Sequence, residues 1–537
     1  MDVKKDSKYR SAILAMTALY TGAAFSLSGC STPTKEIVEA RHKCESLQDV
    51  VISSSEFGLP TGSATVSEAQ LEPGSSKKGN GGYCKLRGYI DAVNSGDLPI
   101  KFQVNLPLTW NGKSIQYGGG GSNGVVVEGT GNFTHAPTDS PIPLMQGYAT
   151  YGGDSGHTTK DKDWVMNSQA YANFSGESVK RTHDAAIALI KRYYGNAPRR
   201  NYFIGGSKGG QEGLVAAQRY GADYDGVISF YPAARAFAMQ MAWGRMGYAA
   251  QEPGAALNQA QQQFVKAKVL AVCDKLDGVE DGLVGRVDEC KNRFSLDSLR
   301  CPIGLDASDT CLSNQQIKGL QVAATPLIFQ FPLANGVKSI GPFPVLEGAD
   351  FGWVLYPPKW APWGNLFVGA GDDVARQVTR DSSMTMPAFD YRNYRERVQS
   401  LSKIYDASST DLERFRQGGG KLLLIQGTTD MLVPHTMTTE YYHSLQSRYG
   451  ANLDNFVSYY LQPGFDHGAG DFTLSVDSLT ALDNWVENGQ APGDLHAIDA
   501  AKKTKGRTRP LCKYPYWAKY QGSGDVNNAT SFKCVTQ

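Results

Sequence analysis

The sequence has almost no excess of charge of either sign: 53 Lys and Arg residues stand against 52 Asp and Glu residues, a formal net charge of +1. Beyond the N-terminus no long run of like charge occurs, which argues against nucleic acid or another polyanion as the main partner. It also has no Cys-x-x-Cys spacing, which makes metal ligation by its cysteines the weaker interpretation. No internal repeat is found. With 537 residues, we expect one large core plus an inserted or appended domain.

The N-terminal thirty residues have the pattern of an export signal. Basic residues between Lys4 and Arg10 precede an apolar stretch at 12–27 that is too short for a stable membrane span. The ending Leu-Ser-Gly-Cys30 resembles the bacterial lipobox, in which the cysteine becomes the lipidated first residue; an ordinary cleaved signal is the alternative. We expect an exported bacterial lipoprotein, periplasmic or at the cell surface, with a soluble domain on a lipid anchor and residues 1–30 as its signal.

The remaining eight cysteines are an even set in a chain sent to an oxidising compartment, which predicts disulfides. Their clustering favours local pairs, although composition alone leaves the connectivity open. The pairs favoured are Cys44–Cys84, Cys273–Cys290, Cys301–Cys311 and Cys512–Cys534.

Two stretches, roughly 85–230 and 400–490, alternate short apolar runs with amphipathic helical periodicity, as strand–helix–strand units do. They look like one sheet split in sequence, which predicts an α/β fold. The expected strands are 101–106, 114–117, 148–151, 202–205, 226–230, 421–426 and 455–461, and the expected helices 179–194, 211–220, 435–449 and 479–487.

The segment from about 231 to 400 breaks this pattern with Gly, Pro, aromatic residues and four cysteines. Its aromatics and cysteines favour a folded lid over a disordered loop. The expected organisation is a core at 31–230, a lid domain at 231–400, and the second part of the core with a disulfide-stapled end at 401–537.

A candidate nucleophile follows the strand expected at 202–205, in Gly205-Gly206-Ser207-Lys208-Gly209. A strand, a tight turn of small residues and a helix form the nucleophile elbow, which exposes a serine oxygen above the sheet. A plain glycine-rich connection is the alternative. The context favours Ser207 as a nucleophile.

A serine nucleophile needs a base, and the base needs an orienting carboxylate, in the chain order Ser, Asp or Glu, His. Asp430 follows the strand at 421–426, and His467 follows the strand at 455–461. Asp466 would have to fold back on its neighbour, and Asp471 comes after the histidine, so Asp430 is preferred as the acid. The other histidines lack this placement, and His135 is among those with no catalytic context.

Acyl transfer also needs donors aimed at the developing oxyanion. Gly119, Gly120 and Gly121 follow the strand at 114–117, and their amides, with the N–H of Lys208, would form the hole. A flexible loop is the alternative. A phosphate cradle is disfavoured because the Gly-Lys-Ser/Thr of a P-loop is missing.

Five motifs together resemble the tannase and feruloyl esterase family, over nearly everything after the signal. They are Trp110-Asn111-Gly112, Gly153-Asp154-Ser155-Gly156-His157, Gly205 to Gly210, Gly418-Gly419-Gly420-Lys421 and Pro463-Gly464-x-x-His467. The resemblance implies an α/β-hydrolase core with a large inserted lid, and it places Ser207, Asp430 and His467 at the family's catalytic triad.

The resemblance also implies a calcium site in the lid. Cys273 begins a loop with three aspartates, whose hard oxygen atoms suit Ca²⁺. The implied ligands are the carboxylates of Asp274, Asp277 and Asp281 with the carbonyls of Val279 and Leu283. A solvated acidic turn is the alternative, and the framing Cys273 and Cys290 favour calcium.

One departure concerns the active-site loops. The family usually has a disulfide between a Cys just before the nucleophile and one just after the catalytic His, but here both positions are glycine, Gly206 and Gly468. A missing native disulfide costs about 2–5 kcal/mol, so the His467 loop should be looser unless packing compensates.

Aromatic residues of the lid, Trp353 among them, would stack on a planar acyl group. Arg376 and Arg380 would clamp a substrate carboxylate, as a terephthalate half-ester requires, although Lys208 explains local positive charge equally well. The leading hypothesis is a serine hydrolase for esters of phenolic, hydroxycinnamic or gallic acids. Alternatives are a terephthalate half-ester hydrolase, a hydrolase of aliphatic substrates, and a non-catalytic surface lipoprotein that binds phenolics.

Overall fold

The computed structural model describes residues 35–74, 82–161, 164–302, 308–358, 361, 365–504 and 506–536. The expected signal and its Cys30 lie outside these residues. Among the helices so described, none combines the length and the apolar character needed to cross a membrane.

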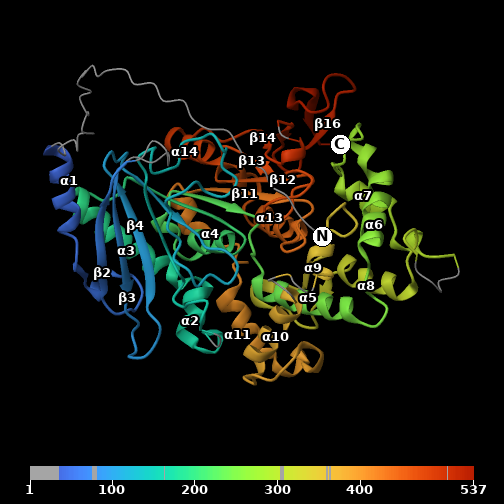
Figure 1. The fold of residues 1–537 in the computed structure, drawn as a ribbon, viewed down its shortest axis with the longest axis horizontal. Helices are drawn as coiled ribbons and strands as arrows, with labels where there is room; N and C mark the ends of the chain where they lie inside the picture. Colours follow the sequence, from blue (N-terminus) through green and yellow to red (C-terminus); the bar gives the residue numbers. More distant parts are fainter. Residues whose placement is uncertain are drawn as a thin grey trace, which may run out of the picture.

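The centre of the fold is a ten-stranded sheet with the order β1-β2-β3-β4-β6-β5-β7-β8-β11-β12 (Figure 1). Strands β6 to β12 along this order run parallel, and β1 to β4 add an antiparallel part. The strands are β1 (Val51–Ile52), β2 (Ala64–Glu72), β3 (Tyr83–Ile90), β4 (Ile100–Pro107), β5 (Lys113–Tyr117), β6 (Ala149–Gly153), β7 (Arg200–Gly206), β8 (Gly226–Phe230), β11 (Lys421–Gly427) and β12 (Val457–Gln462).

The expectation of one sheet split in sequence is confirmed, because β11 pairs in parallel with β8 over its first five residues. Both strands are apolar along almost their whole length, as expected of parallel strands that are covered on both faces. The carboxyl ends of β7, β8, β11 and β12 therefore lie side by side.

Helices cover both faces of the sheet. Tyr202 of β7 shares a buried cluster with Trp485 of α14 (Ser478–Asn488), whereas Phe203 shares another with Leu214 of α4 (Lys208–Arg219) and Tyr441 of α13 (His435–Tyr449). Because successive strand residues point to opposite faces, α14 lies on one face and α4 and α13 on the other. The expected α/β class is confirmed. Two further helices, α1 (Lys35–Glu45) and α3 (Ser178–Tyr194), pack beside β2 to β4.

The structure extends the core beyond the predicted elements at its N-terminal end. Strands β1 and β2 precede residue 85, where the sequence pattern seemed to begin. In β2 the burial alternates irregularly, and a β-bulge interrupts its register between Val66 and Glu68, so the period of two is hard to read in the sequence.

The insertion occupies residues 231–420, between β8 and β11, and most of its helices lie on the side of the molecule away from β2 to β4 (Figure 1). Helix α11 (Arg395–Tyr405) runs across the boundary at residue 400 that the sequence suggested. The other helices are α5 (Ala236–Gln251), α6 (Gln259–Cys273), α7 (Val287–Arg293), α8 (Asn314–Ala324), α9 (Gly352–Leu355), α10 (Leu366–Thr379) and α12 (Glu413–Gln417), with a short pair β9 (Leu327–Ile328) and β10 (Ser339–Ile340). Helix α2 (Ser168–Ala172) precedes α3.

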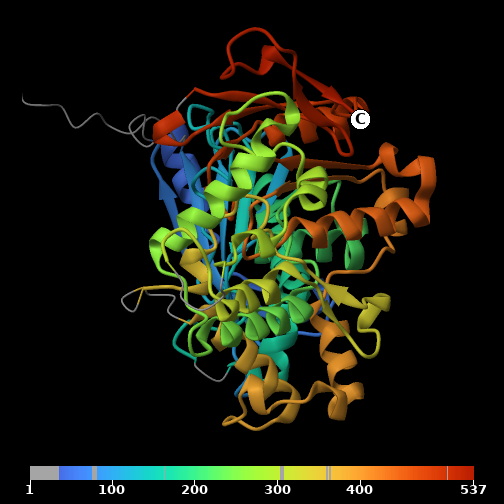
Figure 2. The ribbon, with the colours of Figure 1, turned by 90° about the vertical axis from the view of Figure 1, so that its right-hand side faces the viewer.

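The C-terminal segment forms small sheets at one end of the molecule, red in Figure 2. Strands β13 (Leu474–Ser475), β14 (Leu495–Asp499) and β15 (Thr508–Leu511) form one sheet, and β16 (Trp517–Tyr520) and β17 (Phe532–Val535) form a second. This segment contacts the acidic loop of the insertion, because Arg509 forms an ion pair with Asp281.

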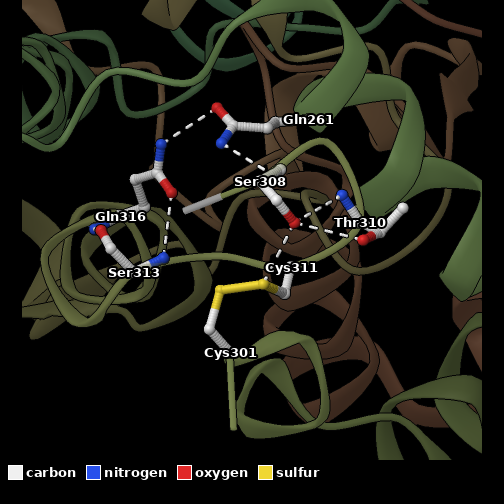
Figure 3. The surroundings of a disulfide bond; sticks show 7 residues. All are labelled: Gln261, Cys301, Ser308, Thr310, Cys311, Ser313 and Gln316. Atoms are coloured by element: carbon white, nitrogen blue, oxygen red, sulfur yellow. Dashed lines mark hydrogen bonds between the residues drawn. A yellow bond between two sulfur atoms is a disulfide. The ribbon is translucent and has the colours of Figure 1, made fainter. Parts of the chain in front are cut away.

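All four favoured disulfides are present: Cys44–Cys84, Cys273–Cys290, Cys301–Cys311 and Cys512–Cys534. Figure 3 shows hydrogen bonds beside the third. The Gln261 amide donates to the carbonyl of Ser308 at 3.2 Å and accepts from the Gln316 amide at 3.0 Å. These bonds connect α6, α8 and the disulfide loop.

Candidate active site

Ser207 lies at the sharp turn between β7 and α4, with φ 60° and ψ −119°, a conformation that side-chain-bearing residues rarely adopt. Its amide donates to the carbonyl of Phe230 on β8 at 3.0 Å. A Cβ atom at Gly205 would lie 2.4 Å from the carbonyl oxygen of Gly209, so only glycine fits there. These features are those of a nucleophile elbow at the carboxyl edge of the sheet.

Asp430 and His467 meet at the same edge, each in the loop that follows its strand. The Nδ1 atom of His467 lies 2.9 Å from Oδ2 of Asp430. The carboxylate is fully buried, and its Oδ1 atom accepts the amides of Leu432 at 2.9 Å and Val433 at 2.8 Å. Two amides therefore fix Oδ1, which leaves Oδ2 for the imidazole.

The electrostatics of this pair favour a charged imidazole. Burial acts to lower the pKa of His467, but the charge of Asp430 and the hydrogen bond to it raise that pKa above its ordinary value. The structure thus brings acid and base together. The Ser207 hydroxyl makes no hydrogen bond to either residue in the described part of the chain, and such contacts often tighten only when substrate binds.

The two rival acids have other partners. Oδ1 of Asp466 accepts the amide of His467 at 2.7 Å and that of Met431 at 3.3 Å. Asp471 forms an ion pair with Lys266 at 2.6 Å. Asp466 therefore supports the two loops through their main chains and does not bond to the imidazole ring.

Asp466 should make stability depend on pH. Burial, together with the charge of Asp430, raises the pKa of Asp466 from 3.8 to about 7. The folded protein then holds a proton that the unfolded chain releases, so this stabilisation is complete below about pH 4 and is lost as the pH rises through about 7. We expect the unfolding free energy, measured with urea at pH 5 to 8, to decrease with rising pH less steeply in Asp466→Asn than in wild type. The two slopes should differ by up to about 1.4 kcal/mol per pH unit. Parallel curves for the two proteins would contradict this.

The glycine loop after β5 differs from the prediction at one residue. The Gly119 amide donates to Oε2 of Glu212 at 3.0 Å, so it is not available to an oxyanion. A Cβ atom added at Gly120 or Gly121 would meet nothing within 4 Å, so these two glycines border open space. They remain the loop's candidates for the second donor beside the amide of Lys208.

Glu212 supports this loop, and the sequence analysis missed it. Besides Gly119, its carboxylate accepts the Asn123 amide at 2.7 Å and pairs with the Lys208 ammonium at 2.8 Å. Lys208 is 3% exposed and lies 4.6 Å above the ring of Phe174, so its charge is neutralised inside the protein and does not face a substrate. The i, i+4 spacing of Lys208 and Glu212 on α4 is the sequence signal for this pair.

The two arginines suggested for substrate binding bond to other groups of the protein. Arg376 pairs with Asp373 at 3.0 Å and lies 3.9 Å from Asp372. Arg380 is the C-cap residue of α10, and its guanidinium donates to the carbonyl of Met166 at 3.2 Å. Trp353 lies in α9, half-buried against the apolar core of the insertion.

The three aspartates of the acidic loop accept main-chain amides of the same loop. Asp274 accepts the amides of Asp281 at 3.0 Å and Gly282 at 2.9 Å, and burial followed by the charges of Asp281 and Asp274 raises the pKa of Asp277 to about 7. A Cβ atom at Gly285 would lie 2.2 Å from Oδ2 of Asp277. Carboxylates and main-chain carbonyls are the ligand types that a hard cation takes, although Asp281 is paired with Arg509 here, so a bound cation would compete with that ion pair.

Comparisons with known proteins agree with this geometry. The family model described as tannase and feruloyl esterase matches residues 84–535. An uncharacterised esterase of Agrobacterium fabrum is 36% identical, with 92% of this chain and 93% of that protein covered. A mono(2-hydroxyethyl) terephthalate hydrolase of Piscinibacter sakaiensis is 28% identical, with 84% and 85% covered.

The crystal structure of feruloyl esterase B from Aspergillus oryzae superposes with a TM-score of 0.75 at 20% identity, covering 92% of this chain and 100% of that one. At this identity the likeness establishes the fold, an α/β-hydrolase core. The expected resemblance is confirmed. The chain belongs to the tannase and feruloyl esterase family and is a carboxylic ester hydrolase.

Proposed function

We propose that the protein hydrolyses esters of aromatic acids through an acyl-enzyme on Ser207. The observation that carries the proposal is the hydrogen bond between buried Asp430 and His467, at the sheet edge where the elbow presents Ser207. This arrangement also opposes the non-catalytic alternative, because a pure binding protein has no need of a buried acid–base pair beside a strained serine.

In the proposed mechanism, the Ser207 hydroxyl attacks the ester carbonyl and gives its proton to Nε2 of His467. Asp430 holds the ring through Nδ1 and stabilises the imidazolium. The amide of Lys208, with that of Gly120 or Gly121, donates to the oxyanion. Collapse releases the alcohol, which takes the proton from His467. Water, activated by the same histidine, then hydrolyses the acyl-enzyme.

The proposed class of substrate, an ester of an aromatic acid, rests on the aromatic residues of the insertion and on the relatives. Phenolic, hydroxycinnamic and gallic acids are planar and stack on aromatic side chains. The terephthalate half-ester alternative has one named relative in its favour. The hypothesis that Arg376 binds the carboxylate of such a substrate is weakened, because Arg376 is already paired with carboxylates of its own helix.

The decisive experiment compares kcat/KM for methyl gallate, methyl ferulate, chlorogenate, a terephthalate half-ester and a short aliphatic ester, with Ser207→Ala as the blank. We expect an aromatic acyl ester to exceed the aliphatic one by at least about tenfold. Preference for the aliphatic ester would refute the aromatic assignment. Preference for the half-ester would select the second candidate.

We further propose that the acidic loop holds a structural Ca²⁺ through Asp274, Asp277 and Asp281 and the carbonyls of Val279 and Leu283. Chelation is expected to lower the melting temperature by on the order of 5 °C, and added Ca²⁺ to restore it.

Asp277→Asn should lower the melting temperature in the same way and respond less to the chelator. Asp288→Asn is the matched control, because the Asp288 side chain is 87% exposed. An unchanged melting curve, in protein shown by elemental analysis to be free of calcium, would count against the site.

For localisation, we propose export and lipid anchoring at Cys30. Expression in bacteria fed with labelled palmitate should label the full-length protein but not Cys30→Ser. Equal absence of label in both would favour the ordinary cleaved signal.

A further inference from the structure

The ring of Tyr231 lies against the imidazole of His467, with ring centroids 4.6 Å apart. Tyr231 follows directly on β8, between the nucleophile strand β7 and the acid strand β11, and its amide donates to the carbonyl of Ile425 at 2.7 Å. A Cβ atom at Gly206 would lie 3.0 Å from the tyrosine ring, so this ring fills the space beside the elbow. One side chain thus bridges the nucleophile turn and the base.

The hydroxyl group of Tyr231 is itself held by His135. The two groups are 2.8 Å apart, and Nδ1 of His135 lies 3.1 Å from the carbonyl oxygen of Leu474. Because a carbonyl only accepts, Nδ1 carries the hydrogen and Nε2 accepts from the tyrosine. Burial lowers the pKa of His135 to about 4, so this direction persists near neutral pH.

The backbone at both residues is strained. Tyr231 has φ 30° and His135 has φ 64°, in the left-handed region that favours glycine. Such conformations cost about 1–3 kcal/mol each and persist where the surroundings enforce them. An aromatic side chain at two such positions indicates that the rings, rather than the turns, are what the site requires.

The loop that carries His467 needs a support of this kind. Gly464, Gly468 and Gly470 all have positive φ values, and the loop turns back on itself through the bond from the Asp466 amide to the Ala469 carbonyl. Phe465 packs edge-on against His135 at 4.8 Å, so the same histidine contacts the loop and holds Tyr231.

We propose that Tyr231, anchored by His135, is a positioning residue that fixes the His467 ring against the nucleophile turn. This inference rests on the proposed function. It also corrects the expectation that His135 has no catalytic context, because the chain fold brings it beside the base through Tyr231. Since the ring acts on the base and not on the substrate, its loss should lower kcat and leave KM nearly unchanged.

The test compares four variants. In Tyr231→Asn the ring is removed, while asparagine tolerates the left-handed backbone. We expect kcat to fall about 30-fold and KM to stay within about threefold of wild type. Tyr231→Phe keeps the ring and should stay within about threefold of wild type. Tyr231→Leu keeps the apolar bulk and should fall as the Asn variant does. His135→Asn removes the hydrogen bond to Tyr231 and also the ring contact with Phe465 of the His467 loop, and it should give an intermediate loss.

Wild-type kcat in Tyr231→Asn, or in Tyr231→Leu should the Asn variant not fold, would overturn the inference. A fall in kcat as large in Tyr231→Phe as in Tyr231→Leu would also overturn the inference, because the ring itself would then make no contribution. Ser207→Ala is measured beside them. If it retains activity, the proposed function fails as well; if it is inactive while Tyr231→Leu is not, only the positioning role fails.

Discussion

Replacing Ser207 by alanine should lower kcat by about 10⁶-fold and abolish labelling by a fluorophosphonate probe. The size of the effect follows from the mechanism: without the hydroxyl, no acyl-enzyme forms, and only weak catalysis by the oxyanion donors and by binding remains. The measurement is steady-state hydrolysis of an aromatic methyl ester, with gel fluorescence of the probe-treated protein.

Ser46→Ala is the control for this experiment, because Ser46 lies after α1 at an exposed position, where its hydroxyl donates to the carbonyl of Lys43 at 2.8 Å. It should label and turn over as wild type does. Equal labelling of wild type and Ser207→Ala would mean that another residue is the nucleophile.

The second large effect is expected from Asp430→Asn, which should lower kcat by about 10⁴-fold at neutral pH. The Asn oxygen still accepts the amides of Leu432 and Val433, so its NH₂ group must face His467. That group donates, which forces the hydrogen of the neutral imidazole onto Nε2. The ring then has no lone pair for the serine proton, although the geometry is kept.

Asp466→Asn is the matched control, because Asp466 is also a buried carboxyl group and is adjacent to the base in sequence. Its oxygen can still accept the amides of Met431 and His467, so kcat should fall less than about tenfold. If Asp466→Asn proved far more damaging than Asp430→Asn, the roles of the two carboxyl groups would have to be exchanged.

Much of the site could be predicted because its parts are local. Ser207 stands in a strand, turn and helix that are contiguous in sequence, and Asp430 and His467 each follow a strand rich in apolar residues. Because the carboxyl ends of parallel strands share one edge, three local patterns were enough to bring these residues together.

The supporting residues could not be found in this way, because their contacts are long-range. Tyr231 and His135 are 96 residues apart, and only the folded chain places them on one another. Glu212 contacts Gly119 across 93 residues. In contrast, the partners of Arg376 could have been predicted from the sequence. Asp372 and Asp373 precede it by four and three residues on one helix, which is the spacing of an ion pair. Such an ion pair competes with a substrate carboxylate for the arginine.

The pairing of β8 with β11 has a consequence for how an active molecule arises. The serine is made early in synthesis, but its acid and base are added only after the whole insertion, and the strand that carries the acid must then dock against a strand made long before. Such non-local closure is slow, and it leaves the edge of β8 open until it is complete. A nascent or truncated chain that ends within the insertion therefore has a nucleophile without a base, so esterase activity appears only when synthesis is nearly finished.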